Sequence, residues 1–378
     1  MIPYGRQDID DADVAAVVAA LRSDWLTQGP QVERFEAAIA AHCGLPYAVA
    51  VNSATSALHI ACLAAGLAPG DTGWTSPNTF VASANAIAYC GAKPDFVDID
   101  ARTWNLDADH LAQKLRQVKP PKLLIPVHFG GLSCDMRAIA ALAREHGCSV
   151  IEDAAHAIGA SYRGRPVGCC EYSDMAVFSF HPVKIVTTGE GGVVVTRDRE
   201  LYQRLLRLRS HGITRDPAQM EGEPDGPWSY QQLELGYNYR ITDIQAALGV
   251  SQLGRLERFI ARRRALALRY DALLADLPVT PQWHPDDARS AHHLYVVLCP
   301  PGSDRGNVYR RMRASGIGVN VHYLPVHLQP YYRRMGFAAG DFPVAEAYYA
   351  RALTLPLYPG LSDALQDQVV AALREALA

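Results

Sequence analysis

The stretch AVFSFHPVKIVTTGEGGVVVT, residues 176–196, contains the features that decide the fold. Two short runs, 176–179 and 193–196, are rich in β-branched and aromatic residues, which favour β-strands. Between them lie one proline, one lysine and three glycines, a composition typical of a loop. We therefore expect two strands joined by a loop that carries Lys184 beside a glycine-rich segment, where a ligand can approach the backbone closely.

Similar apolar runs precede this stretch and alternate with alanine-rich segments of helical periodicity. Such alternation is typical of βαβ units and predicts an α/β fold built on a large, doubly wound, mainly parallel sheet. The other expected strands are 48–51, 94–97, 123–127 and 149–152, and the expected helices are 56–65, 81–89 and 135–146.

The C-terminal third has a different organisation. The tetrad TDIQ at 242–245 has the form of a capping box, which predicts the start of a long arginine-rich helix ending near residue 277, before Pro278. Segments 293–298, 305–315 and 319–323 then have the patterns of a strand, a helix and a strand. We expect a large domain at 1–250, followed at 251–378 by a linking helix and a smaller C-terminal α+β domain.

Composition narrows the class of function. The chain has 49% apolar and 20% charged residues, as ordinary enzymes do, and its net charge of -3 comes without a basic block. We therefore expect neither nucleic-acid nor membrane partners. The eight cysteines are scattered without the spacing of metal ligands, so we expect free thiols, no metal site and a cytoplasmic location.

Lys184 is the best candidate for a reactive group. Ligands of doubly wound sheets bind outside the carboxyl ends of the strands, and Lys184 follows such an end. The other four lysines lie near prolines in expected turns or loops. Partial burial would lower the pKa of the Lys184 amine, and a neutral amine attacks aldehydes to form a Schiff base, the lysine chemistry of pyridoxal phosphate enzymes.

Residues after other strands fit the same cofactor. Asp153 ends the run 149–152, where its carboxylate would keep a pyridine nitrogen protonated, although Asp is equally typical of a helix N-cap. The segment 52–55 precedes a helix, whose N-terminus attracts phosphate, and Ser179 would add a hydroxyl. Phe80 could stack on a pyridine ring, although core packing is the commoner role of a Phe, and His156 could stack or hydrogen-bond there, although a core histidine explains the spacing equally well.

Seven motifs together carry a resemblance to a known family. The chain is similar over essentially its whole length to the nucleotide-sugar aminotransferases of the DegT/DnrJ type, a branch of the fold type I pyridoxal phosphate enzymes. The motifs are WLTQGP at 25–30, NSATSAL at 52–58, SPNTFVAS at 76–83, EDAAHA at 152–157, FSFHPVK at 178–184, EGG at 190–192 and GYNYR at 236–240.

The resemblance implies roles for individual residues. Lys184, Asp153 and His156 would be catalytic, with Lys184 holding pyridoxal 5'-phosphate and Asp153 pairing with its ring nitrogen. Phe80 and His156 would flank the ring. The phosphate would be held by Ala54, Thr55 and Ser179, and by Asn238 from a neighbouring subunit, so that a homodimer shares its active sites.

Within the family, RSHGITR at 209–215 and VHYLPVH at 321–327 are most similar to the transaminase branch of pseudaminic acid synthesis. That similarity implies transfer of an amino group from L-glutamate to C4 of a UDP-linked 4-keto-6-deoxy-N-acetylhexosamine. The residues that would line the sugar and nucleotide pocket are Tyr4, Asp24, Trp25, Leu26, Thr27, His322, Tyr323, Leu324 and Pro325.

The sequence leaves some alternative functions open and argues against others. An aminotransferase for another keto sugar, of the perosamine or bacillosamine type, and a non-catalytic regulator that binds pyridoxal phosphate both stay open. A nicotinamide dehydrogenase and a P-loop enzyme lack their glycine motifs here. A cysteine desulfurase needs a mobile cysteine, and Cys299 before two prolines is a poor one. Sugar dehydratases related to this family carry histidine in place of the lysine.

Overall fold

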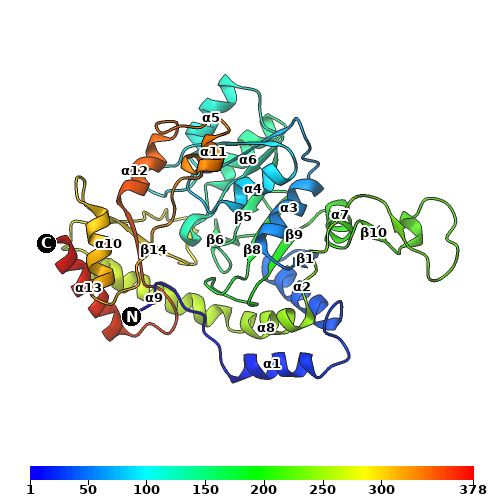
Figure 1. Cartoon of the computed structure of the whole chain (residues 1–378), viewed down its shortest axis with the longest axis horizontal. Coiled ribbons are helices and arrows are strands. Elements are labelled where there is room, and N and C mark those ends of the chain that lie inside the picture. The colour runs from blue at the N-terminus through cyan, green and yellow to red at the C-terminus, as the bar shows by residue number, and fades with distance from the viewer.

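The centre of the molecule is a seven-stranded sheet in the computed structural model, which describes residues 1–378 (Figure 1). Neighbouring strands are parallel except for β9, which is antiparallel to both of its neighbours. The prediction of a mainly parallel sheet is confirmed. The strand order is β1 (Tyr47–Val51), β9 (Gly192–Thr196), β8 (Met175–Ser179), β5 (Ser149–Asp153), β4 (Leu123–Ile125), β2 (Thr72–Thr75) and β3 (Lys93–Phe96).

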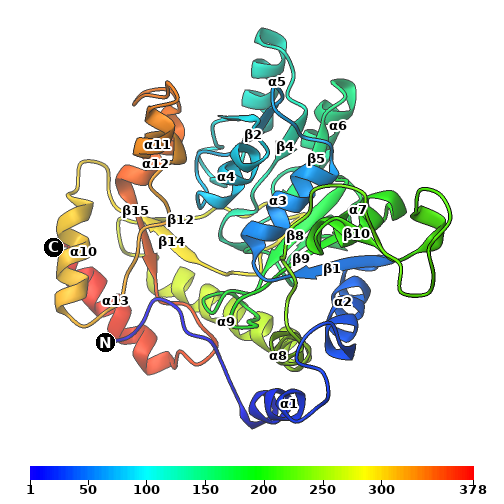
Figure 2. The same ribbon diagram turned by 45° about the vertical axis from the view of Figure 1, so that its right-hand side comes forward.

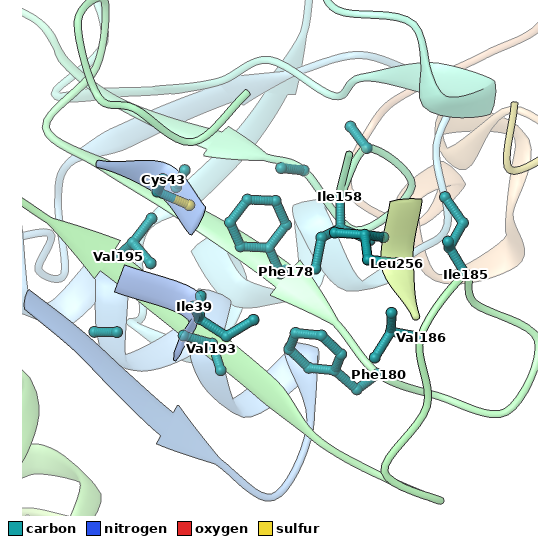
Figure 3. Close-up of a cluster of buried hydrophobic side chains, with 14 of the residues drawn as sticks. Ile39, Cys43, Ile158, Phe178, Phe180, Ile185, Val186, Val193, Val195 and Leu256 are labelled. Atoms are coloured by element: carbon teal, nitrogen blue, oxygen red, sulfur yellow. The ribbon is translucent and has the colours of Figure 1, made fainter. Parts of the chain in front are cut away.

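Helices cover both faces of this sheet (Figure 2). Side chains alternate along a strand, so one face of β8 and β9 packs against α2 and the other against α3. Figure 3 shows the first of these cores, where Phe178 and Phe180 point toward Ile39 of α2. The helices around the sheet are α2 (Pro30–Cys43), α3 (Ala54–Ala64), α4 (Ala82–Tyr89), α5 (Ala108–Gln117), α6 (Met136–Glu145) and α7 (Arg199–Arg209).

Strand β2 was not among the strands predicted from the sequence. Its four residues, TGWT, contain glycine and no run of β-branched apolar residues, so their pattern is weak. Gly73 is required there because a Cβ atom would lie 2.9 Å from the side chain of Ile87 on α4. Close packing of α4 on the sheet therefore explains a residue that local propensity disfavours.

The single long helix expected after Thr242 is in fact two helices, α8 (Asp243–Leu253) and α9 (Leu256–Leu273), so this prediction was wrong in part. The capping box is confirmed, since the Thr242 and Gln245 side chains bond each other's backbone amides. Gly254 has a low helix propensity, and Arg255 turns away from the helical path. Tertiary contacts of Arg255 decide the break.

Arg255 ties the N-terminal segment to the joint between these helices. Its guanidinium forms ion pairs with Asp8 at 3.0 Å, with Asp10 at 2.7 Å and with Asp13. Asp13 is buried in α1 (Asp11–Leu21) and also accepts hydrogen bonds from Ser251 and Gln252, both at 2.6 Å. The network holds α1 under α8, as Figure 2 shows.

The C-terminal unit is an antiparallel sheet covered by helices, which agrees with the predicted α+β pattern. Segment 319–323 is not a strand, because it makes only one bridge, from Asn320 to Thr354. The third strand instead comes from β15. The elements are β12 (Thr280–Pro281), β14 (Tyr295–Leu298), β15 (Ala352–Leu355), α10 (Arg305–Ala314), α11 (Pro330–Arg333), α12 (Pro343–Arg351) and α13 (Asp363–Leu377).

The first residues of the chain lie beside this C-terminal unit (Figure 1). Ile2 bridges Ile317, and the carbonyl of Tyr4 accepts a hydrogen bond from the Leu357 amide at 2.9 Å. A loop between the paired strands β10 (Ile213–Thr214) and β11 (Gln231–Gln232) projects from the large sheet (Figure 1). The last of the four sheets joins β13 (Ala288–Arg289), β6 (Ser161–Tyr162) and β7 (Arg165–Pro166). No helix combines the length and apolar character that crossing a membrane requires.

The Asp13 network generates a stability prediction. Burial raises the pKa of Asp13. Hydrogen bonds from Ser251, the Asp10 amide and Gln252, together with the charge of Arg255, lower the pKa and outweigh burial, so the net pKa is below the usual value. A lowered folded-state pKa stabilises the protein above the usual Asp value near 4, and this contribution disappears as the pH falls through the folded-state pKa.

We expect D13N to reduce the free energy of unfolding at pH 7 by about 2 kcal/mol, because an uncharged amide in this buried position cannot accept all the hydrogen bonds that Ser251, Gln252 and Arg255 donate to the carboxylate. The deficit should shrink as the pH falls below about 4 and through the lowered folded-state pKa, because the wild-type carboxylate then loses its charge as well. Urea unfolding at pH 7 and pH 3 measures both effects. D11N, on an exposed residue of the same helical turn, is the matched control. Equal stability of D13N and D11N at pH 7 would contradict the assignment.

Candidate active site

A cavity of about 870 Å³ lies at the carboxyl ends of β5 and β8. Its walls come from both halves of the chain, because segment 320–323 of the C-terminal unit faces the large sheet across it. The sequence-predicted residues that line it are Tyr4, Ala54, Thr55, Phe80, Asp153, His156, Ser179, Lys184, His322 and Tyr323. Residues that are up to 319 positions apart in the chain therefore share one space.

Lys184 enters this cavity from the loop between β8 and β9. The next residues, Ile185 and Val186, are buried in the apolar core beneath the sheet, where Figure 3 shows them near Phe180 and Leu256. Burial lowers the pKa of the Lys184 amine to about 8, and the negative charge of Asp153 opposes part of this shift. The loop is thus anchored, and its amine loses a proton far more readily than an ordinary lysine amine does.

Asp153, the last residue of strand β5, also lines the cavity and is held in place by hydrogen bonds. Its carboxylate accepts hydrogen bonds from the Ser83 hydroxyl at 2.7 Å and from the Ala155 amide at 3.1 Å. Ser83 in turn contacts the hydroxyl of Thr79 at 2.8 Å. The alternation of strand residues puts Asp153 on the same face as Ile151, which packs toward α3. The carboxylate is buried and oriented without an arginine or lysine salt bridge.

The N-terminus of α3 forms another wall. Ser53 caps the helix by accepting a hydrogen bond from the Ser56 amide at 3.1 Å, and Ala54 and Thr55 provide the first amides, which have no partner inside a helix. Gly192 of β9 lies against this turn, where a Cβ atom would lie 2.6 Å from the Ala54 nitrogen. A glycine is therefore needed for the strand to approach the helix terminus.

An aromatic wall faces the lysine. His156 is buried and packs on His293 with ring centroids 4.4 Å apart, and Tyr323 lies next to Phe80 at 6.1 Å and His322 at 4.8 Å. Burial lowers the pKa of His156 well below its usual value, and the positive charges of Lys184 and His322 lower it further. The histidine is therefore neutral at physiological pH.

Some sequence-predicted residues do not line the cavity of their own chain. Asn238 is exposed, and Trp25 and Leu26 are 54% and 50% exposed, all outside the cavity lining. The residues predicted for the substrate pocket that the lining does not include are Asp24, Trp25, Leu26, Thr27, Leu324 and Pro325.

The sequence reasoning missed several residues of the lining, including His293, Asn320, Glu190 and Gln245. His293 follows no strand of the large sheet, so the rule about carboxyl ends could not find it. Its position depends on Gly131, where a Cβ atom would lie 3.0 Å from the His293 amide and from the His156 carbonyl, at a φ of +101°. The paired glycines at 130–131 were the only available signal.

Comparison with known proteins agrees with this geometry. The profile of the DegT/DnrJ/EryC1/StrS aminotransferase family matches residues 7–374. The chain belongs to this family. It is 42% identical to the spore coat polysaccharide biosynthesis protein SpsC of Bacillus subtilis (strain 168), over 99% of this chain and 96% of SpsC.

Solved structures of sugar aminotransferases have the same fold. Spr1654 from Streptococcus pneumoniae, a candidate sugar aminotransferase in its PMP-form, aligns with a TM-score of 0.93 and 32% identity, covering 100% of this chain and 99% of that one. Helicobacter pylori PseC, an aminotransferase involved in the biosynthesis of pseudoaminic acid, aligns with a TM-score of 0.91 and 30% identity over 100% and 99% of the two chains. The protein is thus a sugar aminotransferase of fold type I, which uses pyridoxal phosphate.

The residues of this DegT/DnrJ family member fit that cofactor. Ala54 and Thr55 line the cavity with the first amides of α3, which have no partner inside the helix and therefore suit a phosphate. A buried carboxylate at Asp153 is the partner that a pyridinium nitrogen requires. Lys184 supplies an amine of lowered pKa in the same cavity.

The opposed Lys184 and Asp153 generate a prediction about charge. Because Asp153 raises the pKa of the Lys184 amine, D153N should lower that pKa further below about 8, and the uncharged fraction at pH 7 should rise several-fold. The chain has only five lysines, so a ¹³C-NMR titration of the cofactor-free protein with methylated lysines resolves each amine. E190Q removes another carboxylate of the cavity lining and should leave the Lys184 pKa unchanged. A rise of this pKa in D153N would refute the prediction.

Proposed function

We propose that this enzyme transfers the amino group of L-glutamate to C4 of a UDP-linked 4-keto-6-deoxy-N-acetylhexosamine, the aminotransfer of pseudaminic acid synthesis. The observation that carries the aminotransfer is the lowered pKa of the Lys184 amine, which lines the same cavity of about 870 Å³ as Asp153. The likeness of motifs 209–215 and 321–327 to that branch, and the similarity to PseC, support the choice of sugar.

Lys184 is proposed as the catalytic base. Bound pyridoxal phosphate supplies an aldehyde and a ring that withdraws electrons from the reacting carbon. With a pKa of about 8, the Lys184 amine is neutral in part of the molecules at pH 7. The neutral amine can accept a proton at Nζ from the α-carbon of the amino donor and pass it on to the cofactor. The apolar anchor at Ile185 and Val186 keeps this amine positioned during the transfer.

Asp153, His156 and the α3 terminus are proposed to hold the cofactor. Asp153 would keep the ring nitrogen protonated, because Ser83 and Ala155 hold its carboxylate in one orientation. His156 and Phe80 would flank the ring. Ala54, Thr55 and Ser179 would hold the phosphate through helix amides and hydroxyls, with the partial positive charge of the helix terminus adding to the attraction.

The sugar is proposed to bind against the aromatic wall. Tyr4, His322 and Tyr323 line the cavity and combine flat apolar faces with hydroxyl and imidazole groups, which suits a sugar ring. Further from the lysine, the exposed residues of the WLTQ turn would reach the nucleotide together with the two residues after Tyr323. These outer residues are Asp24, Trp25, Leu26, Thr27, Leu324 and Pro325.

A homodimer with shared active sites completes the proposal. Tyr237 and Tyr239 stack on each other at 4.8 Å and pack inward against His59, whose ring nitrogen lies 3.1 Å from the Tyr239 hydroxyl. Asn238 lies between them and is exposed, outside the cavity of its own chain. It is therefore available to the phosphate of a neighbouring subunit.

We place this reaction in the cytoplasm. All eight cysteines are free in the structure, which suits a compartment that keeps thiols reduced.

The substrate proposal is tested with a panel of UDP-, GDP- and dTDP-linked keto sugars and L-glutamate. We expect 4-amino product from the UDP-linked 4-keto-6-deoxy-N-acetylhexosamine, and a loss of turnover of more than about 10³-fold in K184A, because no other lysine lines the cavity. K119A, on an exposed lysine, should be as active as wild type.

Each contrary outcome has its own meaning. Preference for a different nucleotide sugar would contradict the proposed substrate and favour a role in another polysaccharide pathway, as for SpsC. A spectrum unchanged by glutamate would point to a cofactor-binding regulator. Normal turnover in K184A would reject the mechanism.

Shared active sites are tested by subunit complementation. N238A should be impaired, because a phosphate contact is lost. In a mixed dimer of K184A and N238A chains, one of the two sites would combine Lys184 with the neighbour's Asn238, so random mixing should restore about a quarter of wild-type activity. If Asn238 acts within its own chain, every site of the mixture is defective and activity stays at the level of the parent variants.

A further inference from the structure

The two ring nitrogens of His156 have partners that fix its tautomer. The Gly130 amide donates to Nδ1 at 3.3 Å, and the Tyr323 hydroxyl lies 3.3 Å from Nε2. A backbone amide can only donate a hydrogen bond, so Nδ1 must be the unprotonated, accepting nitrogen. Since His156 is neutral, its single proton is on Nε2 and faces Tyr323.

Gly130 itself has little freedom to move away from this contact. It has a φ of +66° inside the short turn Phe129–Gly131, and its carbonyl accepts a hydrogen bond from the Leu294 amide at 3.2 Å. The reverse tautomer of His156 would leave the buried Gly130 amide without an acceptor, at a cost of about 1–3 kcal/mol. The turn therefore selects the Nε2-protonated form.

The tautomer of His156 determines where the Tyr323 hydroxyl can direct its own proton. Its oxygen accepts the hydrogen bond from His156, so its own proton is directed elsewhere. The structure gives this hydroxyl no other hydrogen-bond partner, and Tyr323 lines the cavity beside Phe80. Burial raises the pKa of the phenol, so the proton stays on the oxygen. A neutral donor without an acceptor in the protein therefore faces the ligand space.

We propose that Tyr323 donates a hydrogen bond to an oxygen atom of the ligand in this cavity, and that Gly130 and His156 keep this donor available. The inference deepens the proposed function, on which it rests, by assigning a donor where that proposal gives only a lining residue. The acceptor is a carbonyl or phenolate-type oxygen, which both a keto sugar and the ring hydroxyl of pyridoxal phosphate offer. Gly130 is a positioning residue, because it acts through His156.

Y323F removes the donor and retains the ring. If the acceptor belongs to the sugar, kcat/KM for the keto sugar should fall about tenfold, while glutamate turnover in the first half-reaction and the cofactor spectrum stay as in wild type. If the acceptor belongs to the cofactor, the absorbance spectrum and the Kd of pyridoxal phosphate should both change. The inference is overturned if Y323F alters none of these quantities.

Substitutions at His156 test the relay. In H156Q the amide oxygen can accept from Gly130 while its NH₂ donates to Tyr323, so the donor remains free. In H156E the carboxylate accepts the Tyr323 proton instead and consumes the donor. We expect Y323F to lower kcat/KM for the keto sugar about tenfold in the H156Q background and to lower it no further in the H156E background. An equal effect of Y323F in wild type, H156Q and H156E would refute the relay.

Failure of the proposed function has a different signature. If the wild type aminates no keto sugar of the panel, the substrate proposal fails. The cofactor spectrum and Kd of the same variants still measure whether Tyr323 donates to the ligand.

Discussion

The active site depends on the pKa of one amine, which burial lowers and a carboxylate in the same cavity raises. Burial alone would make Lys184 a weak base that seldom carries a proton, and an adjacent carboxylate alone would keep it permanently charged. The two effects oppose each other and leave the pKa at about 8. The buried histidines of the cavity preserve this balance, because burial lowers the pKa of His156 and of His293 well below the usual value and leaves both rings uncharged.

The strand register turns this requirement into a fold. Phe178 and Phe180 point into the core against α2, so Ser179 between them must point to the opposite face, where α3 begins. The pairing of β5 with β8 puts Asp153 beside Val177 on that same face. A one-residue slip in either strand would exchange core and ligand-facing side chains, so packing of the core and placement of the chemistry are specified together.

The parts of the structure that local patterns control were predictable from the sequence. Strands with β-branched runs, the capping box at Thr242 and the lysine loop after β8 were found because periodicity and turn chemistry specify them. The break at Gly254–Arg255 was not, because ion pairs with Asp8, Asp10 and Asp13, more than 240 residues away, decide it. His293 was missed for the same reason, since the turn at 129–131 and not its own neighbours brings it to the cavity.

Gly192 shows how little sequence space such a site leaves open. The clash of any β-carbon there is with main-chain atoms of Ser53 and Ala54, which no rotamer change can relieve. Libraries meant to broaden sugar preference should therefore leave this codon fixed and diversify the aromatic wall at Tyr4 and His322, which line the cavity and have no proposed role in holding the cofactor. In this enzyme the turn at the start of α3 is part of the fixed scaffold, whereas these two side chains of the aromatic wall can vary.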